Sequence, residues 1–203
     1  KWFDKVDSSH LSESSLEDFN FNNGYTYFKN KRYSQAKKYL NRLSDSKKYA
    51  SQAKYYLGFI AYEGDQYETA NALFEEVKGE KRYADDLSYY QADMNFKLGR
   101  FDQAIELGKE QYDTSSPTEK SELSKIIGES YFNLENYKEA LPYLKKYKGR
   151  AGKWNNTDYY QLGYAHYKQG DYKSASAEFN KIIDGTNSVA QNAYYHLGYS
   201  YLK

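Results

Sequence analysis

The sequence predicts an all-α fold, a right-handed α-solenoid of antiparallel helix hairpins. Three observations lead to this prediction. Paired tyrosines followed closely by Leu-Gly recur along the 203 residues, small residues recur every 34 to 36 positions, and an alanine follows each of the first five small residues after twelve positions. A fixed period of this size indicates stacked structural repeats, because each repeat needs its neighbour to bury its apolar face.

Composition excludes several classes of protein. The absence of cysteine excludes a disulfide framework, a thiolate metal site and a catalytic thiol. A net charge of +1 does not favour a nucleic-acid coat or a polybasic membrane binder, and no apolar stretch is long enough for direct membrane insertion. The mean hydropathy of −1.03 is low. The 26 tyrosines nevertheless argue against disorder, since each can bury roughly 150–250 Å².

The repeat is defined by three positions that keep their spacing. The small residues are Gly24, Gly58, Ala92, Gly128, Gly163 and Gly198. The alanines twelve positions later are Ala36, Ala70, Ala104, Ala140 and Ala175. An aromatic residue precedes each alanine by three positions, at Tyr33, Tyr67, Phe101, Tyr137 and Tyr172. Five copies in the same register predict five equivalent units.

Each unit is predicted to be two helices separated by a short break such as Gly64-Asp65. Small residues in both helices let the backbones approach to about 8–10 Å, and the aromatic at the start of the second helix fills the space at the turn. The predicted repeats span approximately 14–47, 48–81, 82–116, 117–152 and 153–187. Residues 1–13 are expected to end a preceding repeat, and 188–203 to begin a further one, so we expect the chain to be a fragment of a longer array.

Two local signals refine this outline. Ser116, Pro117 and Glu119 form the pattern of a capped helix start. Pro142 falls inside a predicted second helix, where it removes a hydrogen bond and is expected to bend the helix.

These residues resemble the tetratricopeptide repeat, whose pattern is W-x2-L-G-x2-Y followed by A-x3-F and a closing Pro. Leu197 and Gly198 match the first part, with Tyr194 in place of Trp, and Ala175 with Phe179 matches the second. The closing Pro is missing, and Gly108 occupies an expected aromatic position in the third unit. The resemblance covers almost the whole chain. The tyrosine-rich, cysteine-free composition of the chain is similar to that of envelope-associated bacterial tetratricopeptide proteins. This similarity favours a periplasmic or cell-envelope location over a cytoplasmic one.

Catalytic and metal chemistry are not indicated. The three histidines are His10, His166 and His196, and although His166 and His196 could approach each other, no third ligand stands at a familiar spacing. The carboxylates are scattered, and no phosphate-binding loop, dinucleotide fingerprint or nucleophile elbow occurs. The sequence therefore predicts a protein that is not an enzyme, with no cofactor and no metal.

A candidate binding surface follows from helical geometry. In the resembled family the first helices line the concave surface. Positions three before, one after and four after each small residue share one helical face. This set, here called the aromatic stripe, is Phe21, Tyr25, Phe28, Tyr55, Phe59, Tyr62, Tyr89, Asp93, Phe96, Lys125, Glu129, Phe132, Tyr160, Tyr164, Tyr167, Tyr195, Tyr199 and Leu202. Two interpretations remain open: a recognition groove, since tyrosine combines a rigid contact area with a polar tip, or packing between neighbouring first helices.

The middle of the stripe is charged rather than aromatic. Asp86, Asp93, Glu122 and Glu129 are expected to face inward around Lys125. This acidic patch would select a ligand segment bearing Lys or Arg. The alternative is a solvated charged face whose ion pairs each contribute under ~1 kcal/mol.

The function predicted from these features is a protein-interaction scaffold that holds a peptide or protein segment along the stripe. No nucleic-acid partner is expected. One alternative is a carbohydrate-binding module that uses the tyrosines together with Trp154 in Lys153-Trp154-Asn155-Asn156. The other is a purely structural spacer that self-associates through its exposed repeat ends.

Overall fold

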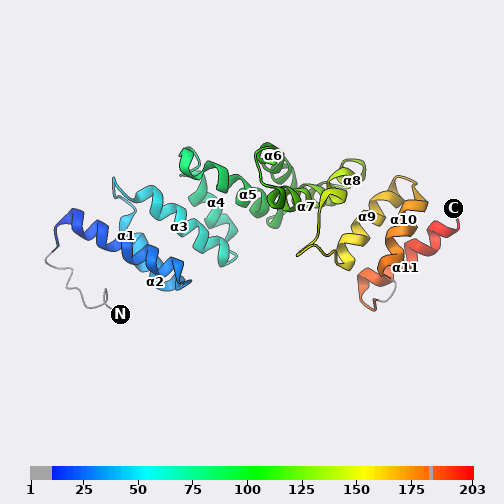
Figure 1. Ribbon diagram of the computed structural model, residues 1–203, viewed down its shortest axis with the longest axis horizontal. Helices are drawn as coiled ribbons and strands as arrows, with labels where there is room; N and C mark the ends of the chain where they lie inside the picture. Colours follow the sequence, from blue (N-terminus) through cyan, green and yellow to red (C-terminus); the bar gives the residue numbers. More distant parts are fainter. Residues whose placement is uncertain (1–10, 183–184) are drawn as a thin grey trace. The chain divides into compact units, whose positions relative to one another are not determined.

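The computed structural model describes residues 11–182 and 185–203, and within them every regular element is helical (Figure 1). The other ordered backbone pairing there is an isolated antiparallel bridge between Arg150 and Lys153. The chain divides into two compact units, with the boundary in the sequence between Leu87 and Ser88. Residues 1–10, which include His10 and most of the segment expected to end a preceding repeat, lie outside the described residues.

The first unit contains two helix hairpins. They are α1 (Glu13–Lys29) with α2 (Tyr33–Leu40), and α3 (Ala50–Glu63) with α4 (Tyr67–Glu75). A short 3-10 turn, η3 (Asn41–Leu43), extends α2, and α5 (Lys81–Lys97) begins in this unit. Within each hairpin the two helices lie side by side, and α3 also packs against α1 and α2. The core between them is built from Ala36, Leu40, Leu43, Ala53 and Ile60.

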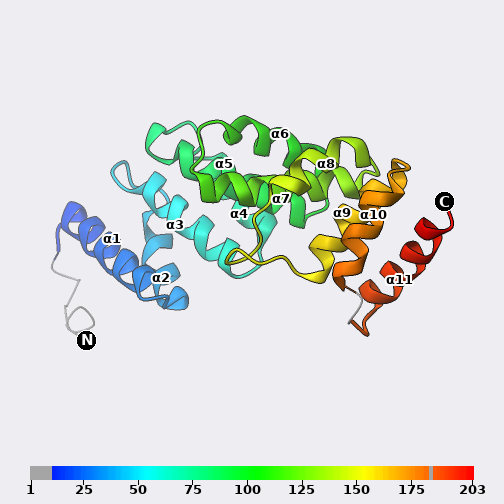
Figure 2. The same cartoon turned by 45° about the vertical axis from the view of Figure 1, so that its right-hand side comes forward.

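The second unit continues the same pattern from the later part of α5. Its elements are α6 (Phe101–Tyr112), α7 (Pro117–Asn133), α8 (Tyr137–Lys146), α9 (Asn156–Lys168), α10 (Tyr172–Phe179), η4 (Asn180–Ile182) and α11 (Ser188–Tyr201). Figure 2 shows α7 beside α8 and α9 beside α10, with α11 packed against the last pair. The predicted all-α solenoid of helix hairpins is confirmed.

Small residues of the first helices meet large residues of the second helices sixteen positions later. A Cβ atom on Gly24 would lie 2.7 Å from Leu40, and one on Gly163 would lie 2.8 Å from Phe179. Gly58 meets Phe74 in the same way, and Gly128 meets Leu144 at 3.0 Å. Such distances leave no room for a side chain, so glycine is required for the helices to approach this closely.

The third hairpin, α5 with α6, lacks this contact between a small and a large residue. Here the small residue of the first helix is Ala92, and the position sixteen later is Gly108 rather than Leu or Phe. The space at Gly108 is occupied by Ile127 of α7, whose Cγ1 would lie 2.8 Å from an added Cβ atom. A side chain from the following hairpin therefore fills the volume that the missing aromatic leaves.

All five hairpin turns share one backbone conformation. The residue seven positions after the small residue has a positive φ in every copy: Lys31, Asp65, Gly99, Glu135 and Gly170, with φ between 56° and 75°. The next residue donates its N–H to a carbonyl five positions back, for example Asp171 to His166 at 3.1 Å. This is the Schellman arrangement, which satisfies the last carbonyls of the first helix.

The two local signals have separate outcomes. Ser116 caps α7, and its side chain and that of Glu119 form a reciprocal capping box, as predicted. Pro142 lies inside α8 without ending it, and the bend expected there stays a prediction. None of the helices in the described ranges is both long enough and apolar enough to cross a bilayer.

Candidate binding surface on the first helices

The stripe rings of the second unit touch each other from one first helix to the next. Phe132 on α7 lies 5.7 Å from Tyr164 on α9, measured between ring centroids. Tyr167 on α9 lies 5.6 Å from Tyr199 on α11. The His196 imidazole fits between them, 4.9 Å from the Tyr164 ring and 4.8 Å from the Tyr167 ring. These rings hold neighbouring hairpins together.

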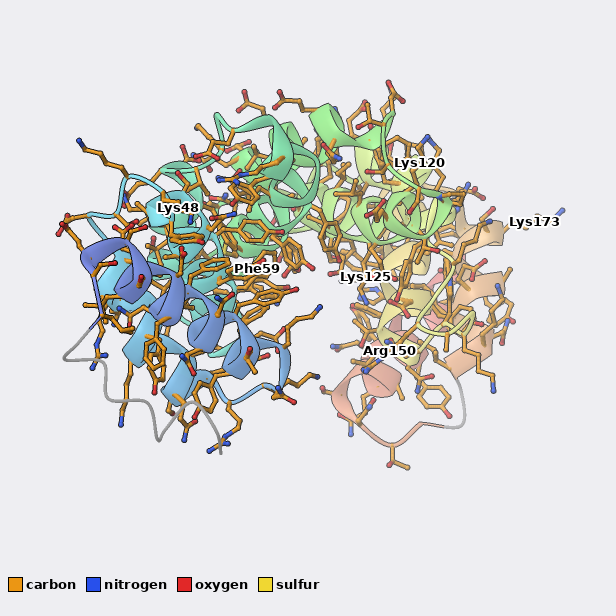
Figure 3. All side chains as sticks on the ribbon, turned by 60° about the vertical axis from the view of Figure 1, so that its left-hand side comes forward. Lys48, Phe59, Lys120, Lys125, Arg150 and Lys173 are labelled. Atoms are coloured by element: carbon orange, nitrogen blue, oxygen red, sulfur yellow. The ribbon has the colours of Figure 1, made fainter. Side chains whose placement is uncertain are left out.

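The first unit uses the same device with partners outside the stripe. The Tyr56 ring on α3 packs against two stripe rings of α1, with centroid distances of 5.3 Å to Tyr25 and 4.9 Å to Phe28. Phe21 stacks on Tyr49 at 4.4 Å with an interplanar angle of 8°. On α3 itself, Phe59 meets Phe74 of α4 at 5.1 Å, and Figure 3 shows Phe59 in this unit among neighbouring rings.

The last stripe residue of each hairpin contacts the aromatic that begins the second helix. The five pairs have centroid separations between 5.3 and 6.1 Å: Phe28–Tyr33, Tyr62–Tyr67, Phe96–Phe101, Phe132–Tyr137 and Tyr167–Tyr172. The expectation that this aromatic fills the space at the turn is confirmed. It also fixes the orientation of one stripe ring in every repeat.

Most side chains of the aromatic stripe are neither fully buried nor fully exposed to solvent. All of its aromatic members on α1, α3, α5, α7 and α9 are half-buried, whereas Tyr195 and Tyr199 on α11 are 69% and 37% exposed. Leu202, just beyond α11, is also exposed. Each half-buried ring therefore packs through one part of its surface and leaves another part to solvent. Packing between first helices is an observed role of the stripe, and the remaining exposed surface is what recognition would use.

The charged residues at the middle of the stripe are paired within the protein. Asp93 forms an ion pair with Lys97 at 2.8 Å. Lys125 lies 3.2 Å from Asp158 and 3.9 Å from Glu129, and its ammonium stands over the Tyr147 ring at 4.8 Å.

Glu129 differs from the expected groove residue because only 8% of it is exposed. Burial raises the pKa of Glu129, and the nearby Lys125 opposes that rise. For Lys125 itself burial favours the neutral amine, but the carboxylates of Glu129 and Asp158 prevail and raise its pKa. The ion pairs agree with the alternative of local pairing, but the buried Glu129 does not belong to a solvated face. The side chain of Asp86 lies outside the described part of the chain.

Two stripe tyrosines are poor acids. Burial raises the pKa of Tyr89 to about 12, with a contribution from the carboxylates of Asp93 and Glu122. Burial likewise raises the pKa of Tyr160 to about 12, together with the phenols of Tyr164 and Tyr137. Both therefore stay neutral hydrogen-bonding groups at physiological pH.

The histidines on α9 and α11 have different environments. His166 is buried, and its Nδ1 lies 3.0 Å from the Asp171 carboxylate at the start of α10. His196 is surrounded by the stripe rings and has an Nδ1 without a hydrogen-bond partner among the described residues. Burial lowers the pKa of both. No group of three metal-ligating side chains forms in residues 11–182 and 185–203.

Sequence reasoning did not identify the residues outside the aromatic stripe whose rings pack against it. Tyr56, Tyr49 and His196 lie outside the three stripe positions, so the period alone did not select them. The doubled tyrosines of the recurring phrase were the available signal, because neighbouring residues on a helix project about 100° apart and reach two different helices.

Three family models match the chain. Two are described as tetratricopeptide repeat and match residues 21–86 and 159–184. The third is described as anaphase-promoting complex, cyclosome, subunit 3, and matches residues 63–147. No curated protein matches the chain by sequence.

Solved structures share the fold at low identity. MamA from strain AMB-1 is 16% identical, with a TM-score of 0.71 over 87% of this chain and 96% of that one. YrrB, a TPR protein with an unusual peptide-binding site, is 18% identical, with a TM-score of 0.73 over 90% of this chain and 95% of that one. A tetratricopeptide repeat protein from Parabacteroides merdae is 14% identical, with a TM-score of 0.66 over 91% and 74%. The repeat register, the hairpins and the family models agree, and the chain is a tetratricopeptide repeat protein.

Proposed function

We propose that this protein-interaction scaffold holds an extended or helical protein segment against the exposed part of the aromatic stripe, without catalysing a reaction. One observation carries the proposal. Half-buried aromatic rings recur on successive first helices. Ring-to-ring contacts between neighbouring hairpins hold them in place. Aromatic side chains held in place by packing lose little entropy on binding, which favours recognition of a partner.

The chemistry of the surface favours some classes of protein segment over others as the partner. The stripe offers phenol hydroxyls and ring edges, whereas its central charges are paired within the protein. A segment with apolar side chains spaced for contact with the rings, and with polar backbone groups for the hydroxyls, fits this surface better than a highly charged one. YrrB shares the fold and binds peptide, which is consistent with the proposal.

Selection from a displayed random-peptide library, followed by affinity measurements, tests the proposal. Tyr62→Ala in the first unit and Tyr167→Ala in the second truncate stripe rings. The matched controls are Tyr39→Ala on α2 and Tyr143→Ala on α8, which remove tyrosines that are likewise half-buried but lie on second helices. Circular dichroism establishes that each variant keeps its helices.

The expected result is a loss of about tenfold or more in peptide affinity for at least one stripe variant, and little change for the controls. Equal losses in both groups would contradict a binding role for the stripe. Saturable binding of glycans that depends on Tyr160 and Tyr164 would support the carbohydrate alternative instead. A concentration-dependent mass without peptide binding would support a self-associating spacer.

A further inference from the structure

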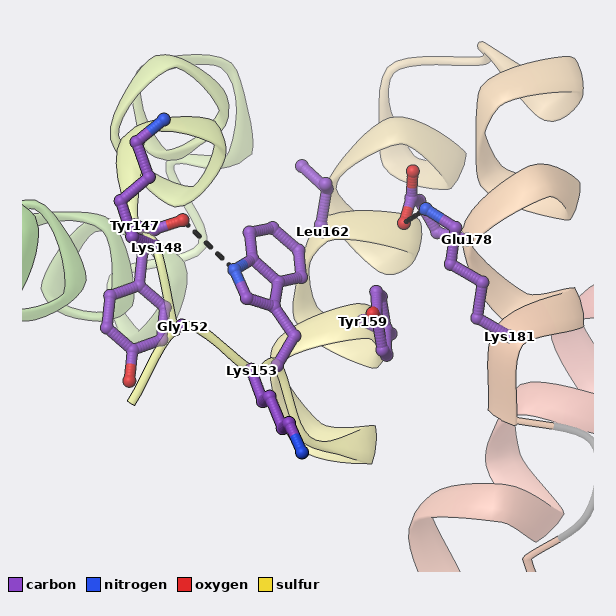
Figure 4. A pocket seen from close by; sticks show the side chains of 9 residues that line it. Tyr147, Lys148, Gly152, Lys153, Tyr159, Leu162, Glu178 and Lys181 are labelled. Atoms are coloured by element: carbon purple, nitrogen blue, oxygen red, sulfur yellow. Dashed lines mark hydrogen bonds and ion pairs between the residues drawn. The ribbon is translucent and has the colours of Figure 1, made fainter. Parts of the chain in front are cut away.

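A cleft separate from the stripe lies in the second unit, beside the loop of residues 147–155 that joins α8 to α9 (Figure 4). Its volume is about 580 Å³. Trp154, Tyr159 and Leu162 form an apolar and aromatic wall, whereas Lys148, Lys153 and Lys181 supply cations around it. The combination of an apolar wall with a basic rim is characteristic of a site for an amphipathic anionic group.

The loop holds the indole of Trp154 in a fixed place. Its Nε1 donates a hydrogen bond to the Tyr147 carbonyl at 3.0 Å, drawn as a dashed line in Figure 4. The indole also lies 6.3 Å from the Tyr147 ring and 5.3 Å from the Tyr159 ring, between centroids. Gly149 has φ +82° and lies so close to the Lys153 backbone that no side chain fits there. The loop is therefore a shaped element and not a simple linker.

The same loop concentrates positive charge. The loop contains Lys148, Arg150 and Lys153, and Lys145 and Lys146 precede it at the end of α8, so five of the nine residues from Lys145 to Lys153 are Lys or Arg and none is acidic, although the whole chain carries a net charge of only +1. Lys148 and Lys153 are exposed, as is Arg150, which Figure 3 labels. In Figure 4 the side chains of Lys148 and Lys153 extend to opposite sides with their ammonium groups outermost.

The neighbouring carboxylate does not neutralise this loop. Glu178 at the cleft is already paired with Lys181 at 2.6 Å. Among the residues that the structure describes, no ion pair joins Lys148, Arg150 or Lys153 to an acidic side chain. The cationic groups of Lys148, Arg150 and Lys153 are therefore exposed and available to an anionic partner.

We propose that this cleft is a second binding site, for a protein segment in which acidic residues flank one aromatic or aliphatic residue. The apolar residue packs against Trp154 and Leu162, and its acidic neighbours meet Lys148 and Lys153. A neutral sugar fits less well, because the indole N–H is already bonded and no Asn, Gln, Ser or Thr is among the described residues that line the cleft. A nucleic acid needs a longer basic surface than one loop provides.

Tryptophan fluorescence provides a direct test. The chain has two tryptophans, so Trp2→Phe leaves Trp154 as the single indole reporter. The probe is an acetylated pentapeptide of sequence Glu-Glu-Phe-Glu-Glu. We expect a saturable change in Trp154 emission that weakens as salt is added. Reversing both loop charges with Lys148→Glu and Lys153→Glu is expected to lower the affinity by about tenfold or more.

The matched control reverses two exposed lysines of the same unit outside this cleft, Lys138→Glu and Lys173→Glu, and is expected to keep the affinity. Tyr167→Ala separates this site from the stripe, because it alters the stripe and leaves the cleft intact. Absence of a saturable signal, or equal losses in the two double variants, would overturn the proposal. Tighter binding of polygalacturonate or of poly-uridylate than of the peptide would also overturn it, in favour of an anionic glycan or a nucleic acid.

Discussion

Phe132 and Tyr164 stand on neighbouring first helices with their ring centroids 5.7 Å apart and their planes inclined by 57°. The contact joins two hairpins, yet both side chains are only half-buried. Recognition and packing between repeats are therefore not exclusive uses of the aromatic stripe. A ring that is fixed by contact with the next hairpin would also lose little entropy on binding a ligand.

The contact between these two rings predicts a measurable coupling. Phe132→Leu and Tyr164→Leu should each destabilise the second unit, and their effects should not add. A double-mutant cycle in urea should give an interaction energy of about 0.5–1.5 kcal/mol, the range found for aromatic pairs beyond their buried area. Strict additivity would mean that the two rings do not interact in solution.

The glycine register predicts opposite signs for one substitution at two equivalent positions. Gly163→Ala should destabilise the protein by roughly 1–3 kcal/mol, because the new methyl group meets the Phe179 ring. Gly198→Ala should be neutral or should stabilise by up to about 1 kcal/mol, since nothing lies within 4 Å of its added Cβ and alanine favours the helix. Thermal unfolding measures both. A stabilising Gly163→Ala would refute the assigned packing.

The shared turn predicts unequal effects on stability for substitutions at two equivalent positions. Gly170 has φ +75°, so Gly170→Ala should cost about 1–2 kcal/mol. Glu135 occupies the equivalent turn position with φ +57°, and Glu135→Gly should relieve strain at that position and cost less than Gly170→Ala. Chemical unfolding of both variants gives the comparison. If Gly170→Ala leaves stability unchanged, the left-handed turn is not required.

Alkaline pH should weaken the fold through two stripe tyrosines. The pKa values of Tyr89 and Tyr160 are raised to about 12 from a usual value near 10. A raised pKa means that the folded state retains protons which the unfolded state has released. Their contribution to stability is therefore complete below pH 10 and is lost as the pH rises from 10 to 12.

Phenolate absorbance and circular dichroism, recorded together, test this loss. The phenols of Tyr89 and Tyr160 should be among those that ionise late, as the helices unfold. Tyr89→Phe with Tyr160→Phe should flatten the pH dependence of stability above pH 10. An unchanged dependence in that variant would assign alkaline unfolding to other groups.

The hairpins were predictable because their signal is periodic and local. Gly24, Gly58, Gly128 and Gly163 recur, together with Ala92, every 34 to 36 positions, and each of the four glycines meets the large residue of its own second helix. The contact of Gly108 with Ile127 was not predictable in this way, since the large residue comes from the following hairpin and breaks the internal period.

The candidate site was predictable only in part. Helical spacing selected the face that carries Phe132 and Tyr164, but it did not show that His196 and Tyr56 would pack among these rings. The sequence indicated Trp154 only as part of a possible sugar-binding surface, and the repeat period did not select the basic loop around it, because that loop belongs to one repeat and has no equivalent in the others. Contacts between repeats depend on how hairpins stack, which the sequence of a single repeat does not encode.

The most direct test of the aromatic stripe is nuclear magnetic resonance of the chain with isotopically labelled tyrosine rings, titrated with a library-selected peptide. Signals assigned by single Tyr→Phe substitutions would be followed at Tyr62, Tyr167 and Tyr199 on first helices, and at Tyr39 and Tyr143 on second helices. Binding at the stripe predicts saturable shifts at one or more of the first three and none at the other two. Shifts confined to Tyr39 and Tyr143 would place the ligand on the opposite helices and contradict the proposed function.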